Sequence, residues 1–193
     1  ATPILRAAEA YLIYLEAYYE RHGNLGGNCD RYWTELRRRA GVDTDYNKTI
    51  AATDLSKEND LAVYSKGIEV DKTLYNIRRE RRCELMGEGM RLDDLKRWRA
   101  LDNMKDYQVE GMNLWDEMYK MYDNGALNGV VSPSGVSNYI RPLQKTSTSV
   151  AYNGYNFPKP HYLEPIPISE FLLTVDGSGN STLYQNPGWP TKS

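Results

Sequence analysis

An arginine- and glutamate-rich stretch at residues 76–98 holds the side chains best placed for chemistry. Glu80, Glu84 and Glu88 recur every four residues, so they share one face if a helix continues through them. With arginines within one turn, this spacing favours a mesh of ion pairs and bidentate arginine–carboxylate bonds. The simpler alternative is an exposed helix whose pairs each contribute roughly a few tenths of a kcal/mol. The residues that we expect to form this structural network are Arg78, Glu80, Arg81, Glu84, Glu88 and Arg91.

The basic run within this stretch raises the alternative of nucleic-acid binding. Four of the five residues 78–82 are arginines, and arginine runs can neutralise phosphate groups. Glu80, Glu84 and the acidic pair at 93–94 interleave carboxylates with these arginines and cancel much of their field. The formal net charge of −2 adds no overall attraction to nucleic acid or to anionic lipid. We therefore expect no nucleic-acid partner.

The sequence offers little material for catalysis. His22 lies next to a predicted helix end, His161 lies in a proline-rich loop, and no serine nucleophile elbow accompanies them. Asp93 and Asp94 are adjacent, so on a helix they point apart and do not form an acid–base pair. We predict that the protein is not an enzyme and uses no cofactor.

Binding of a sugar usually needs an exposed aromatic ring with nearby amides or carboxylates that satisfy hydroxyl groups. Two parts of the sequence offer this combination: Trp115 and Tyr119 with Asn113 and Asp116, and Tyr46 with Asn47 and Asp45. The alternative for each is that the aromatic ring is packed inside the protein, as most Trp and Tyr rings are.

A short acidic segment resembles the opening of a calcium-binding loop, with Asp43, Asp45 and Asn47 at alternate positions. An EF-hand loop requires Gly where Lys48 stands and Glu where Asp54 stands. A solvated loop is therefore the better interpretation, and calcium is kept only as a candidate ligand.

The elements that carry these side chains are predicted to be helices. Residues 3–22 form a helix that is apolar on most sides and that we expect to be covered on several faces. A glycine-rich turn leads to a second helix at 30–40, ended by Gly41, so that residues 3–41 form a helical hairpin of the kind found in TPR arrays. Residues 42–70 are polar and irregular, with a possible short helix near 60–66.

The Arg/Glu-rich stretch belongs to a helix predicted over 71–86, interrupted at 87–89 and resumed over 90–99. Residues 100–193 are rich in loops, with possible helical turns at 114–121 and a short helix capped by Ser169 near the end. The two cysteines, Cys29 and Cys83, are expected to be small buried residues rather than a disulfide or metal ligands. A chain of 193 residues, 40% of them hydrophobic, suffices for one domain with a real core. It begins without an initiator Met or a leader pattern, and we expect it to start inside a larger protein.

Four segments resemble, in order, the conserved pieces of the SusD/RagB family. The most specific is IRRERRCELMGEGMRLDDLKRW at 77–98, which resembles the family's Arg/Glu-rich helix that breaks at Glu-Gly and resumes. The others are an "LRYAEVLL"-like helix at 3–12, an "R-x-R-A-G" helix end at 37–41, and a closing segment with Pro-Ile-Pro at 165–167 and Gln-Asn-Pro-Gly at 185–188.

The resemblance implies a mainly α-helical fold with TPR-like helix pairs, of which this chain is the C-terminal portion. It also implies a lipoprotein anchored at the cell surface in a Bacteroidetes outer membrane through an N-terminal Cys upstream of this chain, working with a SusC-like TonB-dependent transporter. The expected cargo is a glycan; the alternatives are a peptide cargo or a TPR-like protein-interaction scaffold. In this family the Arg/Glu-rich helix is structural, so no catalytic role is carried over.

Overall fold

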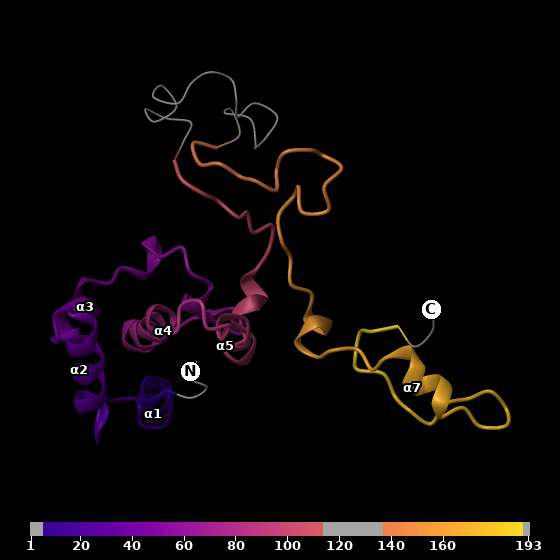
Figure 1. The fold of residues 1–193 in the computed structure, drawn as a ribbon, viewed down its shortest axis with the longest axis horizontal. Helices are drawn as coiled ribbons and strands as arrows, with labels where there is room; N and C mark the ends of the chain where they lie inside the picture. The colour runs from indigo at the N-terminus through magenta and orange to yellow at the C-terminus, as the bar shows by residue number, and fades with distance from the viewer. Residues whose placement is uncertain (1–5, 114–136, 191–193) are drawn as a thin grey trace, which may run out of the picture. The chain divides into compact units, whose positions relative to one another are not determined.

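The computed structural model describes residues 6–113 and 137–190 of the chain, and these form two compact units, Ala1–Asn103 and Met104–Ser193 (Figure 1). The fold is mainly α-helical, as predicted from the sequence. None of the helices in the described parts is long and apolar enough to cross a membrane.

The first unit opens with a helical hairpin. Helix α1 spans Ala7–His22 and helix α2 spans Cys29–Ala40. Both helices end at the predicted glycines, whose φ angles of 69° at Gly23 and 72° at Gly41 place them in the left-handed region that glycine adopts without steric cost. The two helices pack against each other, so the predicted hairpin is present.

The segment between the hairpin and the broken helix is more ordered than its sequence indicates. It contains helix α3 (Tyr46–Ala52), two 3₁₀ turns and a small antiparallel hairpin. The 3₁₀ turns are η1 (Leu55–Lys57) and η2 (Leu61–Val63), and the strands are β1 (Tyr64–Ser65) and β2 (Ile68–Glu69). The prediction missed α3 because a helix of seven residues is too short to show a clear apolar periodicity. The helix expected near 60–66 is a single turn followed by a strand.

The predicted helix break is present. Helix α4 spans Lys72–Glu84, helix α5 spans Arg91–Arg97, and a 3₁₀ turn η3 follows at Ala100–Asn103. Gly87 and Gly89 between α4 and α5 have φ angles of 80° and 81°, a conformation that a helix cannot continue through. The break lets α5 turn back so that its side chains can reach those of α4.

The core of the first unit lies where α1 packs against both α2 and α4 (Figure 1). Leu12 and Leu15 of α1 are fully buried, whereas Ile13 is 52% exposed, so the described residues cover only part of this apolar helix. Cys29 is buried in this core as predicted, but the prediction for Cys83 was wrong: it is exposed, because it lies on the outer side of α4.

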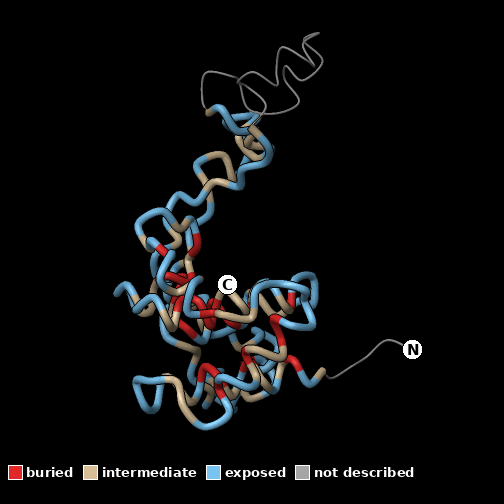
Figure 2. The backbone as a smooth tube through the Cα atoms, turned by 90° about the vertical axis from the view of Figure 1, so that its left-hand side faces the viewer, coloured by how far each residue is buried: buried red, intermediate tan, exposed pale blue. Residues whose placement is uncertain are grey.

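The second unit has far less buried surface. Figure 2 colours the buried backbone red. Among the described residues of the second unit only Phe171 is buried. It contains the 3₁₀ turn η4 (Lys159–Tyr162) and helix α7 (Ile168–Leu173), and its other described residues form turns, loops and isolated bridges. The predicted helix through Leu173 is present, but Ser169 does not cap it, because the helix starts one residue after Pro167 and Ser169 already lies inside it.

The second unit has backbone hydrogen bonds between segments that are distant in the sequence, in place of a core of buried side chains. Tyr107 and Tyr155 form an antiparallel bridge with N–O distances of 2.9 and 2.8 Å. Next to it, Gly154 has a φ angle of +91°, and a Cβ atom there would lie 2.5 Å from the backbone carbon of Asp106. Only glycine fits this approach without backbone movement.

We therefore expect Gly154→Ala to lower the free energy of unfolding by about 1–3 kcal/mol, through the positive φ and the backbone clash. The control is Gly177→Ala, because Gly177 has open space around its would-be Cβ and no positive φ. Thermal unfolding of both variants tests this, and equal melting temperatures would contradict it.

Candidate functional site

The charged side chains of the first unit join its helices through buried ion pairs. Glu16 of α1 is only 4% exposed. Both of its oxygens accept hydrogen bonds from Arg97 at 2.7 and 2.6 Å, and the indole N–H of Trp98 donates to the same carboxylate. A buried carboxylate costs free energy unless it is paired, and this bidentate pairing offsets that cost. Glu16 therefore connects α1 to the end of α5.

A second buried pair closes the angle between α4 and α5. Nε of Arg81 donates to both oxygens of Asp94 at 2.9 and 2.8 Å, and both side chains are 6% exposed. Nε of Arg97 donates to Asp94 as well, at 2.9 Å. Because Arg97 also binds Glu16, the two buried carboxylates are parts of one connected network.

The glutamates at four-residue spacing contact elements other than their own helix. Glu80 accepts bonds from Arg37 and from the indole N–H of Trp33, both at 3.0 Å. Glu84 accepts a bond from Arg6 at 3.0 Å and another from Arg39 of α2. Among the described residues no ion pair joins two side chains of α4, so the spacing serves contacts between helices rather than pairing along one.

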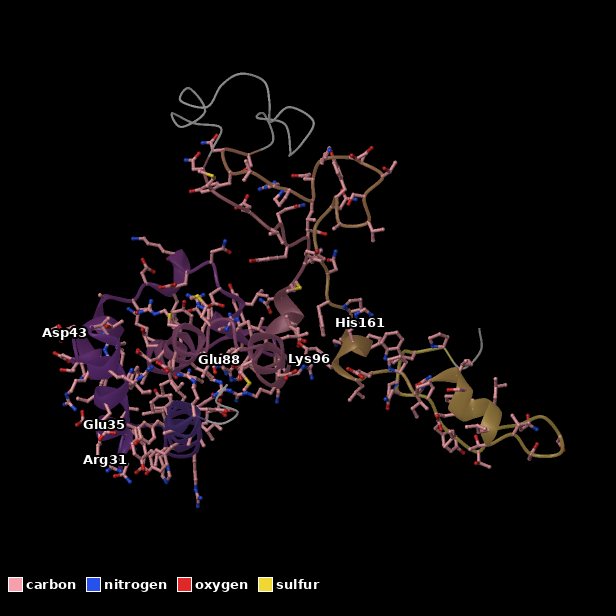
Figure 3. The ribbon with its side chains drawn as sticks, in the orientation of Figure 1. Arg31, Glu35, Asp43, Glu88, Lys96 and His161 are labelled. Atoms are coloured by element: carbon pink, nitrogen blue, oxygen red, sulfur yellow. The ribbon has the colours of Figure 1, made fainter. Side chains whose placement is uncertain are left out.

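The break between α4 and α5 and the segment before α4 complete this set of contacts. Glu88, at the break (Figure 3), accepts two bonds from Arg6 at 3.2 and 2.5 Å. Asp60 binds Arg82 at 2.6 Å and also binds Arg91, while it caps η2. Five of the six residues named from the sequence, namely Glu80, Arg81, Glu84, Glu88 and Arg91, thus lie in contacts of this kind. The sixth, Arg78, donates hydrogen bonds to neutral acceptors and is treated below.

The buried pair at Asp94 predicts a large difference between two neighbouring aspartates. Asp94→Ala leaves Arg81 buried without its counterion, and we expect a loss of about 3–5 kcal/mol in the free energy of unfolding. Asp93 is exposed in the first turn of α5, where its carboxylate contributes only the favourable interaction with the helix dipole. Asp93→Ala should therefore cost less than about 1 kcal/mol. Urea denaturation of the two variants measures both values, and similar midpoints would show that the network contributes little.

Tyr46, a ligand candidate from the sequence, is not an exposed platform. It is 6% exposed and stacks on Trp33 with ring centroids 4.3 Å apart and planes inclined by 3°. Its hydroxyl donates to Asp30 at 3.1 Å. The sequence could not separate a stacked core ring from a binding surface, and here the packing of α3 on the core decided it.

Burial and the neighbouring Asp30 carboxylate raise the pKa of Tyr46 to about 12, against about 10 for a free tyrosine. The folded state favours the neutral phenol, so its contribution to stability is complete below pH 10 and is lost as the pH rises towards 12. We expect stability to fall over that range by of order 2 kcal/mol more in the native protein than in Tyr46→Phe. Tyr184→Phe, at a site 92% exposed, is the control and should follow the native profile. Parallel pH profiles for all three proteins would contradict this assignment.

The calcium candidate residues form a helix start rather than an empty ligand cage. Asp45 caps α3 by accepting the backbone N–H of Asn47, and Asp43 accepts the backbone N–H of Asp45. Lys48 lies 2.8 Å from Asp43 and 3.9 Å from Asp45, and its hydrogen bond lowers the pKa of Asp43 (Figure 3 labels Asp43). The ammonium group occupies the position next to both carboxylates that a cation would take, and no cluster of three or more metal-type side chains occurs in the described residues.

The ligand candidates of the second unit are only partly described. Asn113 is half-buried, its backbone forms a bridge with Tyr139, and its side-chain oxygen is buried without a hydrogen-bond partner among the described residues. Trp115, Asp116 and Tyr119 lie outside the described residues. Asn47 is exposed and belongs to the first unit, so the structure does not bring the two sets of candidates together in one unit.

A stack of aromatic rings on the helical hairpin was missed by the sequence analysis. Tyr11 and Tyr32 stack at a centroid distance of 4.2 Å, Tyr14 meets the Tyr32 ring edge-on at 5.2 Å, and Tyr18 stacks on His22 at 4.2 Å. These four tyrosines are half-buried. The positions of Tyr11, Tyr14 and Tyr18 at intervals of three and four residues were the available signal, but only the pairing of α1 with α2 brings Tyr32 between them.

Comparison with models of known protein families shows to which family the chain belongs. The model of the SusD family (SusD_RagB) matches residues 1–189, almost the entire sequence. The chain belongs to the SusD family. Members of this family are nutrient-binding, surface-exposed lipoproteins associated with the outer membrane, and they are binding proteins rather than enzymes. No curated protein and no solved structure matches the chain significantly.

The family match accounts for the closing segment as well. The Gln185 side chain pairs with the backbone of Ile166, accepting from its N–H at 2.8 Å and donating to its carbonyl at 2.9 Å. The next side chain, Asn186, donates to the Glu164 carbonyl at 2.6 Å. Gln185 and Asn186 of the Gln-Asn-Pro-Gly motif of this SusD-family chain therefore hold the segment around Pro-Ile-Pro by side-chain hydrogen bonds.

Proposed function

We propose that this SusD-family protein captures an oligosaccharide at the cell surface and delivers it to a SusC-like TonB-dependent transporter. The family match over residues 1–189 is the observation that carries this proposal. A lipidated Cys upstream of this chain anchors the protein to the outer membrane, and the remainder of the protein upstream completes its TPR-like helices.

The internal geometry supports non-covalent binding. The arginines paired with Glu16 and Asp94 are engaged in contacts between helices and so serve the scaffold. His22 and His161 each stack on an aromatic ring, Tyr18 and Trp189 respectively. Neither arrangement is that of a general base beside a nucleophile.

We assign the glycan contacts to Trp115 and Tyr119, with Asn113 supplying hydrogen bonds to hydroxyl groups. Exposed indole and phenol rings stack on the apolar faces of sugars, and amides satisfy the hydroxyls. Tyr46 is left out of this assignment because its ring is buried against Trp33.

The test is a glycan and peptide binding screen on the whole protein purified without its lipid anchor. We expect a saturable glycan hit whose affinity falls about three- to tenfold in Trp115→Ala and in Tyr119→Ala, because one aromatic contact contributes about 0.5–1.5 kcal/mol. Tyr184→Ala, which removes a ring that is 92% exposed, is the matched control.

Other outcomes point to other functions. Peptide binding without glycan binding would place the protein among peptide-capturing relatives. If neither glycans nor peptides bind and the SusC-like transporter co-purifies with the protein, the protein is an interaction scaffold whose ligand is the transporter itself.

A further inference from the structure

Arg78 is a buried cation whose ion pair is long and half-exposed. Its side chain is 2% exposed, and it donates to the carbonyls of Ala62 and Tyr64 at 3.1 and 3.2 Å and to the hydroxyl of Ser65 at 2.8 Å. All three acceptors are neutral. Its Nε is buried and has no hydrogen-bond partner among the described residues. The carboxylate within ion-pair distance is that of Glu20, 3.7 Å away and 50% exposed.

Other well-buried arginines of this unit are paired differently. Arg81 contacts both oxygens of Asp94 at 2.9 and 2.8 Å, and Arg37 contacts Glu80 at 3.0 Å. A charge removed from water without a close counterion costs free energy, and burial correspondingly lowers the pKa of the Arg78 guanidinium. An anion bound beside Arg78 would offset this cost.

Arg78 lines a cavity of about 480 Å³ within the first unit, which we call the Arg78 pocket. The size is within the range of small-ligand sites. Three further cations line it, namely Lys66, Arg97 and Arg99, against one carboxylate, that of Glu20.

Two of these cations already form ion pairs with carboxylates outside the pocket lining. Arg97 binds Glu16 and Asp94, and Arg99 binds Asp102. Lys66 is exposed in the β1–β2 turn, and no carboxylate among the described residues lies within ion-pair distance of its ammonium group. Lys66 and Arg78 thus contribute two positive charges to the pocket, and Glu20 is the one carboxylate in its lining.

Apolar side chains also line the pocket. The guanidinium groups of Arg78 and Arg97 lie over the ring of Trp98, 4.6 and 4.8 Å from its centroid, and Val70 and Leu74 complete the lining. A site that combines an excess of positive charge, one hydroxyl and apolar side chains suits a sugar that carries an acidic group better than a neutral one.

We propose that the Arg78 pocket binds the acidic group of an anionic glycan, either the carboxylate of a uronic acid or a sulfate ester, between Lys66 and Arg78. This proposal rests on the proposed glycan-capture function and names the class of glycan. The acidic group supplies a closer negative charge than Glu20 does, and Lys66 supplies a charge-assisted hydrogen bond.

The test compares charged and uncharged forms of one ligand by calorimetry on the whole protein. The probes are tetragalacturonic acid, its fully methyl-esterified form, and a sulfated galactan tetrasaccharide without carboxylates. We expect the ester to bind at least tenfold more weakly than the better of the two acidic probes, and that difference should shrink at high salt because salt screens the charges. The acidic probe that binds distinguishes carboxylate from sulfate recognition.

The matched variants are Lys66→Gln and Lys57→Gln. Lys66 lies on an exposed turn, so its replacement leaves the buried network intact, and we expect about tenfold weaker binding of the acidic probe. Lys57 is 82% exposed and lies outside the pocket, so Lys57→Gln should bind like the native protein.

The outcomes separate this proposal from the function on which it rests. Equal binding of acid and ester, or unchanged acid binding in Lys66→Gln, overturns the anionic pocket and leaves glycan capture standing. Binding of an acidic peptide that depends on Lys66, with no glycan binding, overturns both the glycan class and the proposed cargo. Failure of every acidic and neutral glycan in the screen overturns the capture function itself.

Discussion

The first unit depends on a few carboxylates that are buried between helices and paired with arginines. Glu16 and Asp94 are each about 4% exposed, and both are bound by Arg97. Once these carboxylates are buried, each must keep its arginine, since losing one partner leaves an unpaired charge in a low-dielectric interior. This requirement fixes the position of α5 against α1 and of α5 against α4 more tightly than apolar contacts alone would.

The helix break is the backbone condition for this arrangement. Gly87 and Gly89 adopt positive φ angles, so α5 leaves the line of α4, and Asp94 of α5 reaches Arg81 of α4. An unbroken helix would carry Asp94 and Arg97 about 20–24 Å beyond Arg81 along the axis, at about 1.5 Å per residue, and the buried Arg81–Asp94 pair would not form. The charged side chains of the Arg/Glu-rich segment and the glycine break within it are therefore both required for the buried ion pairing.

The charged residues of this SusD-family chain divide by role. Those at helix contacts, such as Arg37 and Arg81, meet carboxylates at 3.0 Å or less. Arg78 is equally buried but meets only neutral acceptors directly, and it lines a cavity. The difference in counterions, rather than in exposure, separates scaffold from a candidate recognition site.

The sequence by itself determined the helical hairpin, the break in the Arg/Glu-rich helix and the family. Glycine stops such as Gly23 and Gly41 act through local backbone geometry, and family motifs are read directly from the order of residues. Local signals of this kind do not require knowledge of distant parts of the chain.

Only the tertiary structure decided which side chains meet. The four-residue spacing of Glu80 and Glu84 indicated pairing along one helix, yet their partners come from α2 and from Arg6, dozens of residues away in the sequence. Tyr46 is of a residue type that often contacts ligands, but it is buried against Trp33. Cys83 is of a residue type that is usually buried, but it is exposed. Pairing and burial depend on which faces of separate helices come together, and that is a property of packing that periodicity within one segment does not contain.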